Sequence, residues 1–275
     1  MASRRKLSTR PQVTSRRRRY TAPALEKGLD ILELLASVSD AMTHSEIAGR
    51  LGRSLTEVFR MLVCLEERGY ISRTGPDERY QLTLKLFEIV HHHQPLQRLI
   101  AQARPLVQGV ASNTGQSCHL AMLNHAEVVV VAQSEAPGIM GFSVHLGANI
   151  DLLNTASGHV ILAFQSEEVR ARALGAWRFR SRKPVPAGLF RHLNQIRRRG
   201  YEELASYQVH GVVNISYPVL NQHGEAIAAM SVPFLARIGD TVGPPQVKEA
   251  LSLASRTLSS AIGGKRPKLS GALQP

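Results

Sequence analysis

Residues 43–80 read THSEIAGRLGRSLTEVFRMLVCLEERGYISRTGPDERY and contain two helix-start signals in close succession. In each signal a hydroxyl residue precedes a glutamate by three positions, first as Thr43 with Glu46 and then as Ser54 with Glu57. Such a pair stabilises the start of a helix, because the hydroxyl and the carboxylate accept hydrogen bonds from amides that the first turn leaves free. The sequence therefore predicts one helix beginning at Thr43 and a second beginning at Ser54.

The second helix is followed by strand-forming residues. Gly69 can take the left-handed conformation that ends a helix. Residues 70–73 and 79–82 favour strands, and the turn-forming residues 74–78 separate them. A further helix is predicted over residues 24–37, where leucines recur at helical spacing. Helices followed by such a hairpin form a winged helix-turn-helix, the layout of a DNA-binding domain.

The composition indicates a globular protein. The chain has 275 residues, of which 43% are hydrophobic, and is long enough for two domains. No apolar run approaches the roughly 20 residues that span a bilayer, and the basic N-terminal stretch lacks a following hydrophobic region. We therefore expect a cytoplasmic protein without membrane contact. Cys64 and Cys118 lie far apart in predicted apolar elements, which favours small buried residues over a disulfide or a metal pair.

The net charge of +13 is concentrated in the two ends of the chain. Residues 1–19 carry eight basic side chains and no acidic ones, and residues 265–275 add three basic side chains. Residues 20–95 hold eight basic and eleven acidic side chains, so DNA binding there requires a sided distribution. We expect the acidic residues to lie on the predicted helix over residues 24–37. The basic residues are expected on the helix that begins at Ser54 and on the hairpin of residues 70–82, which is the wing. These basic residues are Arg53, Arg60, Arg73 and Arg79.

The chain divides into five predicted segments. These are a disordered basic arm (residues 1–22), the winged helix-turn-helix (23–83), a linker helix (84–95), a second domain (96–264) and a disordered basic tail (265–275). The arm contains Arg16, Arg17, Arg18 and Arg19. Arms of this kind enter the minor groove of DNA or follow its phosphates, and the alternative is a solvated tail.

The second domain is predicted to be α+β with a mainly antiparallel sheet, because strands in sequential hairpins alternate with helices. The helix over residues 96–112 contains Pro105, which predicts a kink or a restart. The other predicted elements are strands at 119–123, 127–132, 140–146, 212–220 and 225–234, and helices at 155–164, 166–174, 188–199 and 247–262.

This order of elements, together with several short phrases, resembles the IclR family of bacterial transcriptional regulators over residues 24–262. The phrases are ALEKGLDIL at 24–32, EIAGRLG at 46–52, LEERGY at 65–70, TASG at 155–158 and RGY at 199–201. The resemblance implies a homodimer or homotetramer whose winged domains read a palindromic operator in double-stranded DNA. It also implies a GAF-like C-terminal domain that binds a small-molecule effector.

The predicted recognition helix departs from the family pattern at its start. The family usually has a proline, a basic residue and small hydroxyl residues where this chain has residues 54–57, whereas Val58 and Arg60 match. The operator sequence is therefore not transferable from the family. Arg60 is predicted to contact a guanine edge or a phosphate, and the alternative is a solvent-facing pair with Glu57. The predicted DNA-binding residues are Arg53, Ser54, Thr56, Glu57, Arg60, Arg73 and Arg79, with the four arginines of the arm.

The resemblance also implies an effector pocket lined by six residues. These are Ala156, Ser157, Leu204, Asn214, Ser231 and Pro233. Leu204 and Tyr207 stand where the family has acids, and Pro233 replaces a usual serine. Backbone amides at the predicted helix start hold a carboxylate well, so we expect a small organic acid with an apolar or aromatic body. The alternative is an ordinary helix start with packed small residues.

Other functional classes have less support. The sequence contains no hydrolase motif of the Gly-x-Ser-x-Gly type, no phosphate-binding glycine loop and no catalytic paired-carboxylate motif. A small-molecule-converting enzyme with an accessory DNA-binding domain stays the alternative. A DNA-coating protein would need basic residues throughout its fold. The histidines at 91–93 cannot share one helix face, and His119, His145, His159 and His210 lack zinc-site spacing, so no metal, cofactor or catalytic residue is assigned.

Overall fold

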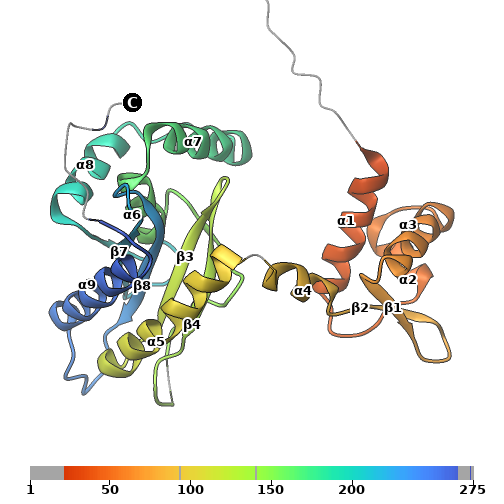
Figure 1. The fold of residues 1–275 in the computed structure, drawn as a ribbon, viewed down its shortest axis with the longest axis horizontal. Helices are drawn as coiled ribbons and strands as arrows, with labels where there is room; N and C mark the ends of the chain where they lie inside the picture. The colour runs from red at the N-terminus through yellow and green to blue at the C-terminus, as the bar shows by residue number, and fades with distance from the viewer. Residues whose placement is uncertain (1–21, 93, 140, 266–272, 274–275) are drawn as a thin grey trace, which may run out of the picture. The chain divides into compact units, whose positions relative to one another are not determined.

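The computed structural model describes residues 22–92, 94–139, 141–265 and 273 (Figure 1). These residues form two compact units, one up to residue 92 and the other from Gln94 onward. The predicted arm, with Arg16, Arg17, Arg18 and Arg19, lies outside the described residues except for residue 22. Within the described ranges, no helix combines the length and the hydrophobicity needed to cross a membrane.

The first unit is a winged helix-turn-helix, as predicted. Its elements are α1 (Pro23–Ala36), α2 (His44–Leu51), α3 (Leu55–Glu67), β1 (Ile71–Thr74), β2 (Arg79–Leu82) and α4 (Lys85–His91). Both predicted capping boxes are present, at Thr43 before α2 and at Ser54 before α3. Gly52, with a φ of 62°, makes the left-handed turn between these helices. Buried side chains of α1, α2 and α3, including Ile31, Ile47 and Leu62, form the core.

The second unit is α+β with an antiparallel sheet, which confirms the predicted fold class. The helices are α5 (Gln94–Thr114), α6 (Ala156–Phe164), α7 (Glu167–Ser181), α8 (Leu189–Arg199) and α9 (Pro244–Ala261). The strands are β3 (Cys118–Asn124), β4 (Glu127–Ser134), β5 (Asn149–Asp151), β6 (Glu202–Ala205), β7 (Val212–Leu220) and β8 (Ala226–Leu235). They form one sheet in the order β5-β4-β3-β8-β7-β6.

Helices cover both faces of this sheet (Figure 1). Alternate residues of each strand point to opposite faces. On one face Ala121, Val130 and Ala229 belong to a core with α6, α7 and α8. On the other face Leu120 and Met230 belong to a core with α5 and α9. The candidate effector residues are therefore assigned to a face by their position along each strand.

Four local predictions were wrong or incomplete. The described residues of 140–146 form no strand; Gly147 has a φ of 77°, and the short strand β5 follows it. The four-residue strand β6 was missed. Helix α5 continues through the exposed Pro105 without a restart. Cys118 is buried as expected, but Cys64 is exposed.

Candidate functional site

One face of α3 is exposed and has the composition of a recognition surface. Val58 and Leu62 anchor the helix in the core of the first unit. The opposite face exposes Leu55, Thr56, Phe59 and Arg60. Neither Thr56 nor Arg60 makes a side-chain hydrogen bond or ion pair with another described residue. These two side chains are therefore available to a partner molecule.

Ser54 and Glu57 have structural roles at the start of α3. The Ser54 hydroxyl donates to Glu57 Oε2 at 2.9 Å, and Lys27 Nζ donates to Glu57 Oε1 at 2.6 Å. The hydrogen bond from Lys27, followed by those from Ser54, lowers the pKa of Glu57 to about 2. The alternative pairing of Glu57 with Arg60 is not what the structure shows. Glu57 is thus a charged, already partnered side chain beside the recognition face.

The three other predicted arginines of this unit each bind a carboxylate of their own domain. Arg53 pairs with Asp30 of α1 at 2.5 Å. Arg73 pairs with Glu66 at 2.9 Å and with Glu78, and Arg79 pairs with Glu46 at 3.1 Å. The expectation that acidic residues of the first helix lie apart from the basic cluster is therefore wrong for Asp30. Any contact of these arginines with DNA competes with an ion pair.

In the second unit, the structure brings the six predicted effector residues to one face of the sheet. Leu204 on β6 is paired in register with Asn214 on β7, which is paired in register with Pro233 on β8. Ser231 lies two positions before Pro233 and therefore shares its face. The first turn of α6 supplies Ala156 and Ser157, and the Ser157 hydroxyl lies 3.0 Å from that of Ser231.

Buried polar groups form a row across this face. Ser231 Oγ lies 2.7 Å from Ser216 Oγ, and both serines are buried. His119 on β3 is the register partner of Ser231 and is also buried. Neither ring nitrogen of His119 has a hydrogen-bond partner among the described residues. Burial lowers the pKa of His119 to about 4, so the ring is neutral at physiological pH.

Helix α6 begins against this row. Its N-cap residue Thr155 accepts a hydrogen bond from the Gly158 amide. Gly158 is required by close packing, since a Cβ there would lie 2.0 Å from the Leu152 carbonyl oxygen. The amides of Ala156 and Ser157 have no hydrogen-bond partner within the described residues. A helix N-terminus with free amides is a favourable environment for an anion.

The candidate effector site is buried on the side of α6 and β8 and partly exposed at β6 and β7. Ala156, Ser157, Ser231 and Pro233 are buried, whereas Leu204 and Asn214 are half-buried. A cavity of about 480 Å³ between β7 and α9 is lined by other residues and lies outside this site.

Comparisons with known proteins fit this two-domain arrangement. The family described as "IclR helix-turn-helix domain" matches residues 24–75, and "Bacterial transcriptional regulator IclR C-terminal" matches residues 92–260. The chain belongs to the IclR family. The HTH-type transcriptional regulator BhcR of Paracoccus denitrificans is 30% identical over 213 residues, which cover 76% of each chain. The family consists of transcriptional regulators, which are not enzymes, and this member is accordingly a DNA-binding transcriptional regulator.

Solved structures of IclR-family proteins share the fold. The Thermotoga maritima IclR structure is 26% identical with a TM-score of 0.65, covering 87% of this chain and 98% of its own. An IclR homologue from Microbacterium hydrocarbonoxydans, solved in complex with 4-hydroxybenzoate, is 23% identical with a TM-score of 0.71, at the same coverages. The latter similarity shows the fold alone.

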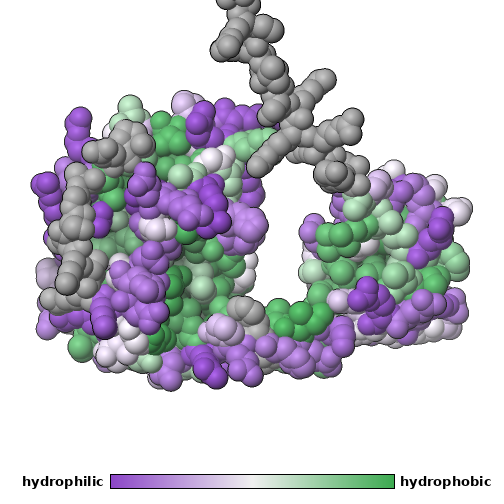
Figure 2. Space-filling model, turned by 45° about the horizontal axis from the view of Figure 1, so that its top comes forward, coloured by the Kyte–Doolittle hydropathy of each residue, from purple (hydrophilic) through white to green (hydrophobic). Residues whose placement is uncertain are grey.

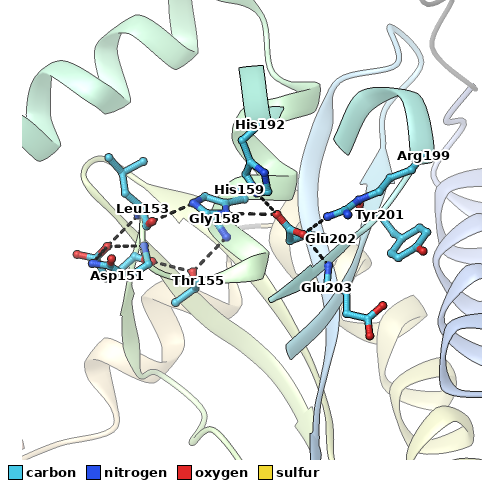
Figure 3. A network of polar contacts seen from close by, with 11 residues as sticks. Asp151, Leu153, Thr155, Gly158, His159, His192, Arg199, Tyr201, Glu202 and Glu203 are labelled. Atoms are coloured by element: carbon cyan, nitrogen blue, oxygen red, sulfur yellow. Dashed lines mark hydrogen bonds and ion pairs between the residues drawn. The ribbon is translucent and has the colours of Figure 1, made fainter. Parts of the chain in front are cut away.

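A second polar cluster of this IclR-family chain was not predicted from its sequence (Figure 3). Glu202 of β6 is fully buried and contacts His192 of α8, Arg199 and His159 of α6. Burial lowers the pKa of both His159 and His192. His159 was considered as a ligand with His119, His145 and His210, but its actual partners lie on α8 and β6. The one signal in the sequence that could have indicated this cluster is Glu202, the acidic residue directly after the RGY phrase at 199–201.

Proposed function

We propose that this regulator binds a palindromic operator in double-stranded DNA and that a small organic acid bound in its second unit modulates operator affinity. The observation that carries the effector assignment is buried His119, whose ring has no hydrogen-bond partner among the described residues. It is the register partner of Ser231, which contacts Ser157 at the start of α6. Buried polar groups normally have hydrogen-bond partners, and an unpaired one costs about 1–3 kcal/mol. A ligand that supplies these bonds is therefore favoured at this place.

An acid with an apolar body suits the chemistry of the site. The α6 amides offer donors to a carboxylate, and neutral His119 offers one further N–H. Asn214 and Ser231 provide orienting polar groups, whereas Leu204 and Pro233 provide apolar surface. The 4-hydroxybenzoate bound by the Microbacterium hydrocarbonoxydans homologue is an acid of this class. We expect very small, purely polar acids to bind more weakly.

On DNA, the N-terminal half of α3 is expected to enter the major groove, with Thr56 and Arg60 facing the bases or phosphates. The residues proposed to flank this contact with DNA are Arg53, Arg73, Arg79, Ser54 and Glu57. The arginines of the arm are proposed to contact phosphates. Reading a palindrome requires two copies of the domain. Exposed apolar side chains on the first unit support a homodimer or homotetramer (Figure 2); they include Leu25, Leu29, Leu84 and Ile89.

The test uses the full-length protein. Fragments selected from random DNA give the operator, and fluorescence anisotropy then measures operator affinity with and without aromatic and short aliphatic acids. We expect one acid class to change the affinity by roughly 5–150-fold, a coupling of about 1–3 kcal/mol. A response only to acids as small as glyoxylate would contradict the proposed role of the apolar surface of Leu204 and Pro233. No response to any acid would contradict the effector role of the second unit. Turnover of the bound acid would instead indicate an enzyme.

A further inference from the structure

We infer that His159, His192 and Glu202 form a binding site for a divalent transition metal, with Zn²⁺ as the ion that fits best. Each residue offers one ligand atom, and these atoms lie within 4.8 Å of one another. They come from three elements, α6, α8 and β6, that the fold brings together (Figure 3). Two histidines with one carboxylate form a common zinc ligand set that leaves a fourth position open.

The main evidence is the orientation of the His159 ring. Its Nε2 lies 2.9 Å from the Leu153 carbonyl oxygen, which only accepts hydrogen bonds, so Nε2 carries the proton of the neutral ring. The lone pair of Nδ1 is therefore directed into the cluster. Nδ1 is buried, has no hydrogen-bond partner among the described residues and lies 3.4 Å from Glu202 Oε2. A lone pair and a carboxylate at this distance repel each other unless a proton or a metal ion lies between them.

The spacing of these two atoms matches a shared metal. With zinc–ligand bonds of about 2.0–2.1 Å and tetrahedral angles, ligand atoms lie about 3.3 Å apart. The 3.4 Å separation of His159 Nδ1 and Glu202 Oε2 agrees with this value. His192 Nε2 contacts the same carboxylate oxygen directly, so its ring must rotate to admit an ion. His192 is only partly buried, with 35% of its side chain exposed, and this gives the ring room to rotate and gives the ion a path.

The surroundings hold the ligands in the way that metal sites require. Histidine ligands usually donate their second ring nitrogen to a carbonyl or carboxylate, and Leu153 provides that carbonyl for His159. The other Glu202 oxygen, Oε1, accepts from Arg199 and from the Glu203 amide at 2.7 Å. This leaves Oε2 directed at both imidazoles. Glu202 is fully buried, and a buried carboxylate is stabilised by charge and hydrogen-bond partners of this kind.

The site adjoins the candidate effector site. Glu202 is the register partner of Ser216, and its strand carries Leu204 two positions later. His159 lies two residues after Ser157 on α6. A bound ion would therefore fix the edge strand β6 to the start of α6, and both elements supply effector residues. Metal binding itself does not require that the effector proposal be correct.

The experiment measures zinc binding by the chelator-treated full-length protein. Calorimetric titration with Zn²⁺ and visible absorption of the Co²⁺ form are compared for the wild type, His192→Gln and His210→Gln. His210 is an exposed histidine of the same unit and serves as the matched control. Because His192 is partly exposed, its replacement keeps the fold, which circular dichroism verifies.

We expect one tight site per chain in the wild type and in His210→Gln, with a tetrahedral Co²⁺ spectrum. His192→Gln should lose at least about 100-fold in affinity, since even changes to outer partners cost 10–100-fold. Equal zinc binding by all three proteins, or none by the wild type, overturns the proposal. An intact metal site with no response to organic acids would refute the effector assignment alone.

Discussion

The hydroxyl oxygens of Ser157 and Ser231 lie 3.0 Å apart and join the first turn of α6 to β8. Ser231 also contacts the Ser216 hydroxyl at 2.7 Å, so it is the central member of a buried chain of three hydroxyls. Replacement of Ser231 by alanine removes a group that we expect to orient the effector. The variant Ser231→Ala should bind the acid about 10-fold more weakly, corresponding to a hydrogen bond of about 1–1.5 kcal/mol.

The control for this variant is Ser255→Ala. Ser255 is equally buried in the same unit, but it donates to the Ser252 carbonyl within α9. Both variants should lose comparable stability in chemical denaturation, whereas only Ser231→Ala should lose acid affinity in calorimetry. Equal acid affinity in the two variants would remove Ser231 from the effector site.

His119 should make the protein sensitive to mild acid. Its pKa is about 4 in the folded protein because of burial, against about 6.5 in the unfolded chain. The unfolded state therefore takes up a proton first, and stability is lost as the pH falls from about 6.5 to about 4. The full effect is about 3 kcal/mol. The variant His119→Leu should show a smaller loss of free energy of unfolding over this range in urea titrations.

The comparison for His119→Leu is His223→Gln, which changes an exposed histidine of the same unit. That variant should keep the pH dependence of the wild type. His159 and His192, whose pKa values burial also lowers, contribute to the slope in all three proteins. If His119→Leu has the wild-type slope, His119 is hydrated or partnered in solution.

Local signals in the sequence were sufficient for much of the fold. Thr43 with Glu46 and Ser54 with Glu57 form hydrogen bonds within one helical turn, so their capping boxes were predictable from spacing alone. The end of α3 was also predictable from a local signal, because Gly69 takes the left-handed conformation with a φ of 74°. The IclR resemblance supplied the six effector positions, whose meeting across β6, β7, β8 and α6 depends on strand register.

The contacts missed from the sequence are those between distant segments. Asp30 and Arg53 lie far apart in the sequence, and only the packing of α1 against the helix-turn-helix brings them together. The Glu202 cluster joins α6, α8 and β6, and no spacing in the sequence relates His159 to His192. The position of His119 beside the effector residue Ser231 follows from the pairing of β3 with β8, which the sequence did not predict.

Arg60 should carry specific operator affinity. It is exposed on α3 and has no ion pair with a described residue, so its guanidinium can reach DNA without breaking an ion pair. Arg60→Ala should weaken operator binding by about 1–3 kcal/mol and relax the preference at one base pair per half-site. Anisotropy on the operator and on single-base variants measures both effects. Arg178→Ala, an exposed arginine of α7, should bind like the wild type; unchanged affinity of Arg60→Ala would exclude Arg60 from the interface.

The arm should add affinity without choosing a sequence. A run of arginines neutralises phosphates through its charge, which does not depend on the base sequence. Deletion of residues 1–19 should weaken binding to operator and random DNA alike. The slope of log affinity against log salt should become shallower by about 0.9 for each phosphate that the arm neutralises in the full-length protein. Titrations at several salt concentrations test this, and an identical slope with and without the arm would show that the arm does not touch DNA.

Phe59 and Leu55 should read thymine methyl groups. Both side chains are about half exposed on α3, at 49% and 53%, and lie one helical turn apart beside Thr56 and Arg60. Apolar side chains in the major groove discriminate thymine through its 5-methyl group. Phe59→Ala should therefore lose affinity for the operator, and substitution of deoxyuridine for a contacted thymidine should weaken the wild type by a similar factor. The combination should not be additive, because the variant no longer contacts the methyl group. Additive losses would mean that Phe59 acts elsewhere, for example in its ring contact with His44 at 5.8 Å.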